Sequence, residues 1–191
     1  MNKIYVGYGK RLLDAVIAVA VGLIALPAGL VAALVVRLDD GQAALFRQQR
    51  VGYHGRPFTL LKFRSMAIGT ANVASANAAT LAVTRVGRIL RRSNLDEIPQ
   101  LWNVLRGDMS LVGPRPALPS QTDLCRLRAA GGATTVRPGL TGLAQVNAYD
   151  GMSEREKAEW DARYAKSVSF ARDMAILLRT FRYLLKPPPR Y

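Results

Sequence analysis

The feature that most constrains the fold of this chain is a long apolar run near its N-terminus. Residues 12–36 are apolar apart from Asp14, and a run of about 25 residues is long enough to cross a bilayer. Pro27 lies inside the run, where a proline removes a backbone hydrogen bond and bends or breaks a helix. A sharp break would leave limbs of about 22 and 14 Å, and neither would cross a hydrocarbon core of about 30 Å.

Positive charges flank this run on both sides. They are Lys3, Lys10 and Arg11 before it, and Arg37, Arg47 and Arg50 after it. Because cytoplasmic flanks carry the excess of lysine and arginine, both ends are expected on the cytoplasmic face. The sequence therefore predicts a re-entrant helix hairpin broken at Pro27, with a proline-kinked spanning helix as the alternative. Asp14 follows Lys10 by four residues, so we expect these two side chains to pair at the membrane interface.

The composition indicates a folded domain with anionic partners. Hydrophobic residues make up 50% and charged residues 21% of the chain, so a core can form and disorder is not expected. The 27 basic residues against 13 acidic ones give a formal net charge of +14, which favours phospholipid headgroups, nucleotides or nucleic acid. The single cysteine, Cys125, excludes an internal disulfide. The single histidine, His54, argues against a Ser-His-Asp triad and a His-rich metal site.

Hydrophobic periodicity indicates a mixed α/β domain that is mostly helical. Strands are expected at 44–49 and 57–66, followed by an uncharged surface loop at 67–84. Helices are expected after Asp96, at 153–165 and at 170–185. The last has an apolar side with arginines opposite or at its margins, which is typical of an amphipathic C-terminal helix in the membrane interface. A helix packed on the domain core is the competing interpretation.

Two adjacent carboxylates, Asp96 and Glu97, stand out because arginines precede them in a strongly basic chain. Apolar residues follow at helical spacing, and Pro99 is tolerated only near a helix start, which places both acids at or just before the first turn. Flanking arginines hold carboxylates ionised and attract phosphate, so Asp96 is a candidate nucleophile for phosphoryl chemistry. On these residues alone, helix capping by Asp96 is the favoured interpretation.

Two proline-containing turns present further arginines. Gly113-Pro114-Arg115-Pro116 limits backbone freedom on both sides of Arg115, which suits a preorganised phosphate contact. Arg137-Pro138-Gly139 repeats the theme. Taken singly, either segment is an ordinary turn with a solvated arginine.

Five blocks together resemble one family, the bacterial sugar transferases, which are small monotopic phosphoglycosyl transferases. The blocks begin at Lys62, Thr84, Leu95, Gly107 and Val136 and read KFRSM, TRVGR, LDEIPQLWNVL, GDMSLVGPRP and VRPGLTG. The similarity runs from about residue 10 to residue 186. Ordered motifs of this length are far more specific than a short pattern, and they reverse the preference for a capping role.

The resemblance implies an enzyme that transfers a sugar 1-phosphate from a UDP-sugar to a polyprenyl (undecaprenyl) phosphate and releases UMP. This would be the first membrane step in assembling a bacterial glycan such as an exopolysaccharide, capsule, O-antigen or glycoprotein. By position, Asp96 matches the nucleophile, which forms a phosphosugar-aspartyl intermediate, and Glu97 matches the Mg²⁺ ligand. The matching phosphate-binding residues are Lys62, Arg91, Arg115 and Arg137. Asp161 matches a further acidic position whose role the resemblance leaves open.

The resemblance also implies a fold and a location. Residues 1–37 would be the re-entrant membrane anchor, 38–186 the catalytic domain on the cytoplasmic face of the bacterial inner membrane, and 187–191 a tail. Nucleic acid is not an expected partner, and a homodimer is left open. Two departures bear on sugar specificity: Leu143 stands where the family usually has an aromatic residue, and the loop at 67–84 lacks the acidic residues of many members.

Two other interpretations remain open at this point. A basic membrane- or nucleic-acid-binding protein without catalysis would explain the charge and the anchor, but not a carboxylate pair kept among arginines. Within enzymes, Asp96 could act as a base in a single displacement through a ternary complex.

Overall fold

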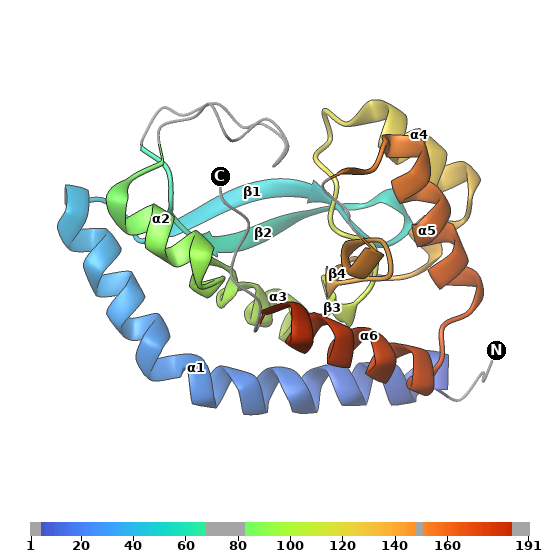
Figure 1. The fold of residues 1–191 in the computed structure, drawn as a ribbon, viewed down its shortest axis with the longest axis horizontal. Coiled ribbons are helices and arrows are strands. Elements are labelled where there is room, and N and C mark those ends of the chain that lie inside the picture. The colour runs from blue at the N-terminus through green and yellow to red at the C-terminus, as the bar shows by residue number, and fades with distance from the viewer. Residues whose placement is uncertain (1–4, 68–82, 148–150, 185–191) are drawn as a thin grey trace.

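A bent N-terminal helix underlies the rest of the chain in the computed structural model, which describes residues 5–67, 83–147 and 151–184. A π-helical segment, Tyr5–Gly9, continues directly into α1, Lys10–Asp40. α1 follows one side of the molecule and then bends, so that its second limb rises beside α2, Arg85–Arg92 (Figure 1). Pro27 lies inside this continuous helix, so the chain does not break there as the sequence predicted. Proline removes a single backbone hydrogen bond, and the turns on either side keep theirs, so the helix bends without ending.

α1 is exposed in a way that a core helix is not. The helix is long and apolar enough to cross a membrane, and 17% of its most apolar 18-residue stretch is buried against the rest of the protein. Leu23, Ile24 and Leu30 are among the large apolar side chains that α1 leaves exposed. An exposed apolar surface of this length is typical of a surface that contacts a membrane or another protein, so α1 is compatible with a monotopic membrane anchor.

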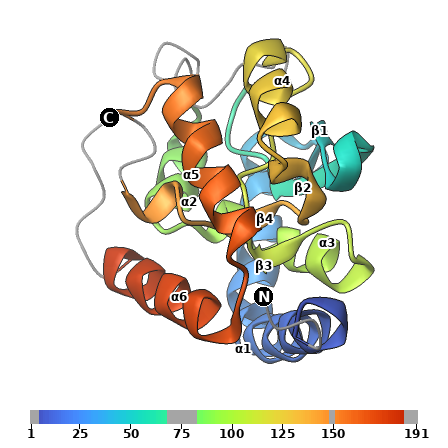
Figure 2. The same cartoon turned by 90° about the vertical axis from the view of Figure 1, so that its right-hand side faces the viewer.

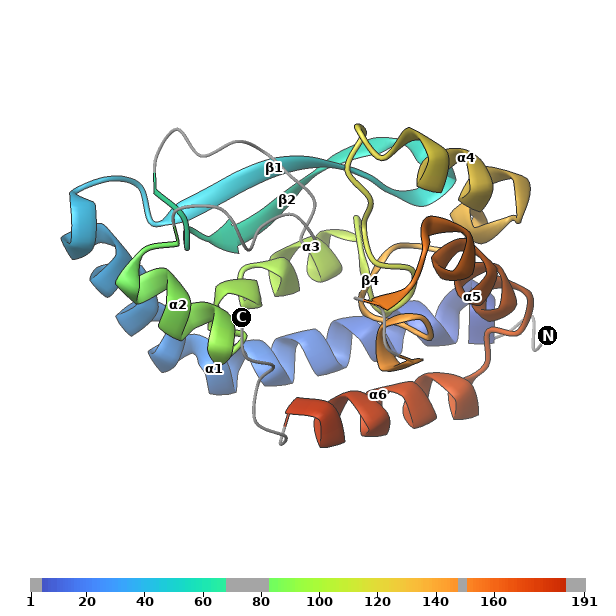
Figure 3. The same cartoon turned by 45° about the horizontal axis from the view of Figure 1, so that its top comes forward.

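A two-stranded antiparallel ribbon crosses above α1 (Figure 3). β1, Leu45–Val51, pairs with β2, Pro57–Phe63, in a register that joins Leu45 to Phe63 and Val51 to Pro57. Both strands were predicted, with ends that differ by a few residues. Part of the expected loop at 67–84 lies outside the described residues.

The remaining elements form a helical layer around a short parallel ladder. α3, Gln100–Arg106, leads to β3, Ser110–Val112, which pairs in parallel with β4, Gly139–Thr141. α4, Thr122–Ala130, packs on α5, Glu154–Lys166, and the chain continues into α6, Phe170–Leu184 (Figure 2). α5 confirms the helix expected at 153–165, and a capping box between Ser153 and Glu156 fixes its start.

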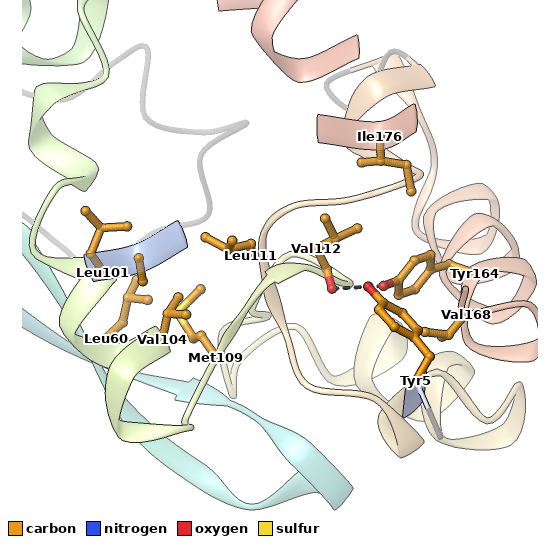
Figure 4. Close-up of a cluster of buried hydrophobic side chains, with 11 residues drawn as sticks. Tyr5, Leu60, Leu101, Val104, Met109, Leu111, Val112, Tyr164, Val168 and Ile176 are labelled. Atoms are coloured by element: carbon orange, nitrogen blue, oxygen red, sulfur yellow. Dashed lines mark hydrogen bonds between the residues drawn. The ribbon is translucent and has the colours of Figure 1, made fainter. Parts of the chain in front are cut away.

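The core lies where α3, β3, α5 and α6 meet (Figure 4). Val104 and Met109 are fully buried, and Val112, Tyr164 and Ile176 are nearly so. These side chains pack β3 against the helices, so the turn that follows β3 and carries Arg115 starts from a fixed strand.

A buried carboxylate ties α1 to this core. Asp173 of α6 accepts hydrogen bonds from the Tyr5 hydroxyl at 2.6 Å, the Lys10 ammonium at 2.7 Å and the Tyr164 hydroxyl at 2.7 Å. Asp14 is also buried and accepts from the backbone N–H of Leu111 at 3.1 Å. The ammonium of Lys10 binds Asp173 directly and acts on the buried Asp14 only through its charge, so the pairing expected at the membrane interface takes the form of a longer-range attraction.

α6 has a core side and an exposed apolar side. Asp173 and Ile176 are buried, whereas Phe170, Leu178 and Phe181 are more than half exposed. The helix therefore packs on the domain, as one of the two interpretations held, while keeping apolar side chains on its outer surface. α1 and α6 follow the same side of the molecule (Figures 1 and 2).

Candidate active site

The turn before α3 holds the two acidic residues. Leu95–Glu97 forms a 3-10 turn and Pro99 is the N-cap of α3, which confirms the predicted position of Asp96 and Glu97. Pro99 has no side-chain capping bond, so Asp96 does not cap this helix. Asn94 adopts a φ of 55°, in the left-handed region that asparagine tolerates better than most residues. This reversal separates α2 from the acidic turn, in which Asp96 is 7% exposed.

Lys62 and Arg115 converge on the acidic turn from two other elements. The ammonium of Lys62, on β2, lies 2.8 Å from Oε1 of Glu97 and 3.8 Å from Oδ2 of Asp96. The Nη2 atom of Arg115, on the turn after β3, lies 3.4 Å from the same Glu97 oxygen. Lys62, Asp96, Glu97 and Arg115, which span more than 50 positions of the sequence, therefore form one cluster, as the family resemblance implied.

Arg91 reaches this cluster from α2 because a glycine allows a close approach. A Cβ atom at Gly87 would lie 1.9 Å from the backbone oxygen of Ser65, so any larger residue would push α2 away from the end of β2. With α2 in place, Nε of Arg91 donates to the Ser65 hydroxyl at 2.9 Å. Its positive charge lies close enough to Asp96 to lower the pKa of that carboxyl.

The two carboxylates have opposite electrostatic environments. Burial is the largest influence on Asp96 and raises its pKa; the negative charge of Glu97 adds to this, while Lys62 opposes it. Burial also acts to raise the pKa of Glu97, but the charges and hydrogen bonds of Lys62 and Arg115 outweigh it and lower that pKa to about 2. The expectation that neighbouring cations hold the carboxylates ionised is confirmed for Glu97 and is wrong for Asp96, because burial of Asp96 outweighs the cations around it.

Arg137 and Asp161 lie apart from the carboxylate pair. Nε of Arg137 donates to the backbone oxygen of Gly107 at 2.9 Å, and its guanidinium stacks over the Tyr53 ring. Gly107 is the C-cap of α3, so Arg137 binds the end of this helix opposite the acidic turn. Asp161 is 1% exposed and pairs with Arg128 of α4.

Sequence reasoning missed Arg50 and Arg128, which both contact the Arg115 turn. Arg50 donates to the oxygen of Pro116 at 3.0 Å, and Arg128 donates to the oxygen of Arg115 at 2.8 Å. In a chain with 27 lysines and arginines, nothing in the sequence distinguishes these two from solvated surface charges. Only the packing of α4 and β1 around the turn reveals them.

The donor set of the site fits Mg²⁺. Among residues 5–67, 83–147 and 151–184, no group of three histidine, cysteine, aspartate or glutamate side chains could hold a metal. Asp96 and Glu97 supply two adjacent carboxylates, and Mg²⁺ is commonly held by one or two carboxylates together with waters and substrate phosphates. A metal here would depend on a phosphate-bearing substrate to complete its coordination.

The family resemblance implies that Arg115 contacts substrate phosphate; on that expectation, replacing it with lysine should reduce kcat/KM for the UDP-sugar roughly 10- to 100-fold, the value of one charge-assisted hydrogen bond. Lysine keeps the charge but cannot reproduce the planar fork that binds two phosphate oxygens at once. Steady-state kinetics should be compared with those of the exposed-site control Arg155→Lys. Near-normal kinetics for Arg115→Lys would reduce Arg115 to a structural turn residue.

The fold and the site together define a domain with an exposed apolar helix and a pair of carboxylates held by lysine and arginine side chains. The profile of the bacterial sugar transferase family matches residues 5–187, and the chain belongs to this family.

Three relatives illustrate the breadth of this similarity. UDP-glucose:undecaprenyl-phosphate glucose-1-phosphate transferase of Caulobacter vibrioides is 43% identical, with all of this chain aligned to 75% of the relative. An uncharacterized sugar transferase of Bacillus subtilis is 42% identical over 79% of this chain and 74% of its own length. UDP-galactose-lipid carrier transferase of Erwinia amylovora is 36% identical over 95% of this chain, but this chain spans 41% of its length.

Proposed function

We propose that this protein transfers a sugar 1-phosphate from a UDP-sugar to a polyprenyl phosphate, undecaprenyl phosphate in bacteria, and releases UMP. The observation that carries the proposal is a buried Asp96 beside an ionised Glu97, in a cluster with Lys62, Arg91 and Arg115. Family membership and the names of the relatives from Caulobacter vibrioides and Erwinia amylovora support the same reaction class. Because these names include both glucose and galactose, the identity of the sugar is left open.

The reaction proceeds in two displacements at one phosphorus atom. Asp96 attacks the β-phosphorus of the UDP-sugar, the bond to the bridging oxygen breaks, and UMP leaves. The resulting phosphosugar-aspartyl intermediate is then attacked by an oxygen of the polyprenyl phosphate, which restores the carboxylate and forms the polyprenyl diphosphate sugar. Two steps suit substrates that occupy different phases, because the nucleotide can leave before the lipid reacts.

The cations of the site have a direct role in this chemistry. A diphosphate repels a carboxylate until the diphosphate charge is neutralised. Lys62 and Arg115 lie beside Glu97, where they would contact the diphosphate oxygens and neutralise this charge. Burial raises the pKa of the Asp96 carboxyl, and the positive charges of Lys62, Arg91 and Arg115 oppose this and favour the anion that attacks. Arg91, held by Ser65, adds a third positive charge on the α2 side.

Glu97, with Asp96 beside it, would hold Mg²⁺. When bound, the metal supplies further neutralisation of the diphosphate charge. Glu97→Gln should raise the Mg²⁺ concentration required for half-maximal turnover by about tenfold or more, since a ligand charge is lost. A Mg²⁺ titration of turnover measures this, with Glu159→Gln at an exposed position of α5 as control. An unchanged titration curve would remove Glu97 from the metal site.

The exposed apolar surfaces of α1 and α6 support a proposed membrane arrangement. α1 enters the cytoplasmic leaflet of the inner membrane and returns to the same face at its bend, while the exposed Phe170, Leu178 and Phe181 of α6 lie in the interface. The positive flanks at both ends of the apolar run support this orientation. The acidic turn would then lie at the surface where a lipid phosphate emerges.

Replacing Pro27 with leucine should let the apolar run straighten to about 37 Å, enough to span, and expose the N-terminus of some molecules to the periplasm. The measurement is thiol labelling of Lys3→Cys and Arg47→Cys, each in a Cys125→Ala background, in intact cells and in lysates. With Pro27 present, both positions should label only after lysis. Labelling of either position from outside in that protein would replace the re-entrant course with a spanning helix.

The reaction itself is tested by UMP release from a panel of UDP-sugars with Mg²⁺ and a polyprenyl phosphate. We expect release from at least one donor, together with a lipid-linked sugar diphosphate. A binding protein without catalysis would release no UMP from any of them.

A further inference from the structure

The backbone of the Arg115 turn is fixed at three successive carbonyl groups. The oxygen of Pro114 accepts from the backbone N–H of Gly139 at 2.9 Å. The oxygen of Arg115 accepts from Nη1 of Arg128 at 2.8 Å, and that of Pro116 from Nη1 of Arg50 at 3.0 Å. The prolines on both sides of Arg115 already restrict its φ and ψ angles, so the hydrogen bonds place a segment that is stiff in itself.

Arg128 is itself locked by Asp161. Oδ2 of Asp161 lies 2.8 Å from Nε and 2.6 Å from Nη2 of Arg128. Arg128 is 6% and Asp161 1% exposed, so neither side chain has room to move away. Nε of Arg128 thus donates to the carboxylate of α5, Nη2 lies beside the same oxygen without hydrogen-bond geometry, and Nη1 donates to the Arg115 carbonyl.

Such a buried pair is poorly explained by stability alone. Removing two charges from water offsets most of their attraction, and an apolar pair of similar volume often stabilises a fold as well. A guanidinium fork does provide a fixed geometry that an apolar pair cannot. Because Arg128 also donates to the Arg115 main chain, the fixed geometry of the guanidinium can hold the Arg115 turn in place.

We infer that Arg128, held by Asp161, and Arg50 are positioning residues that set the reach of Arg115 toward Glu97 and the substrate phosphates. The α4–α5 pair then acts as a brace for the phosphate-binding turn, and Asp161 acts through Arg128 without touching substrate. This inference rests on the proposed function, because it assigns these residues a purpose in phosphate binding.

Arg128→Lys tests the brace while keeping the charge. Lysine can still pair with Asp161, but it cannot also hold the Arg115 carbonyl as the fork does. We expect kcat/KM for the UDP-sugar to fall about tenfold, the scale of a small misplacement of a binding group. Arg50→Gln, which removes the other side-chain donor, should have a smaller effect in the same direction. The matched control is Arg126→Lys, on the same helix and exposed, which should leave kcat/KM unchanged.

The decisive comparison is a double-mutant cycle with Arg115→Ala. If Arg128 and Arg50 act through Arg115, adding either substitution to Arg115→Ala should lower kcat/KM by less than about twofold further. Full, independent losses in that background would overturn the inference while leaving the proposed function intact. If Arg128→Lys does not fold, the Arg50→Gln cycle tests the same coupling to Arg115. A wild-type protein that releases no UMP from any UDP-sugar would overturn the proposed function and this inference with it.

Discussion

Asp96→Asn should lower turnover by about 10³-fold or more while leaving the protein folded. Asparagine has nearly the same size and shape, but its amide cannot form the acyl phosphate that the proposed mechanism requires. The buried carboxyl of Asp96 is bound mainly through charge, with Lys62 at 3.8 Å, so a neutral residue fits without leaving a strong hydrogen bond unmade. UMP release and a thermal unfolding curve, measured on the same preparation, give the two readouts.

The control for this variant is Asp123→Asn, at an exposed position on α4 that pairs only loosely with Arg126 at 3.3 Å. It should match the wild type in both assays. If Asp96→Asn retained more than a tenth of wild-type turnover, Asp96 could not be the nucleophile. Retention of UMP release only in the presence of the acceptor would favour a single displacement with a different group as base.

Asp173→Ala should have the largest effect on stability, about 3–5 kcal/mol. It would remove the common acceptor of Tyr5, Lys10 and Tyr164 and leave the Lys10 ammonium, largely buried, without its carboxylate. For a chain of this size the loss corresponds to a melting temperature lower by about 10 °C or more. The measurement is thermal unfolding in detergent or nanodiscs.

Asp123→Ala provides the matched comparison, since it removes an exposed carboxylate whose pairing contributes little. A melting temperature for Asp173→Ala within about 2 °C of the wild type would mean that the network does not hold α1 to the domain. A lowered melting temperature with faster proteolysis near residues 5–10 would locate the loss at the start of α1.

Much of the architecture could be predicted because it depends on local patterns. The apolar run, the proline within it, the two strands and the helices over α5 and α6 all follow from periodicity and breakers. Pro27 was predicted to break the helix, whereas α1 stays continuous, because one missing hydrogen bond bends a helix that neighbouring turns still support. Whether the helix breaks or only bends at Pro27 depends on the elements packed against it, and local sequence patterns do not reveal these contacts.

The candidate site was predictable where residues are adjacent or belong to long motifs. Asp96, Glu97, Lys62 and Arg115 meet as expected, but Arg137 lies at the far end of α3. Asp14 and Asp173 were not identified as anchors, because a single acid in an apolar helix could equally be solvated, paired or buried. The partners of Asp161 and Asp173 come from other helices, and only the folded chain brings them together.

The proposed mechanism depends above all on a covalent bond between the sugar phosphate and Asp96, and this species can be trapped. The protein would be incubated with a UDP-sugar carrying ³²P at the β-phosphorus and Mg²⁺ without acceptor, then quenched in acid and separated. We expect label on the protein, stoichiometric release of UMP, no label on Asp96→Asn, and transfer of the label to lipid when polyprenyl phosphate is added. An active wild-type protein that never carries label, and releases UMP only when the acceptor is present, would contradict the two-step mechanism.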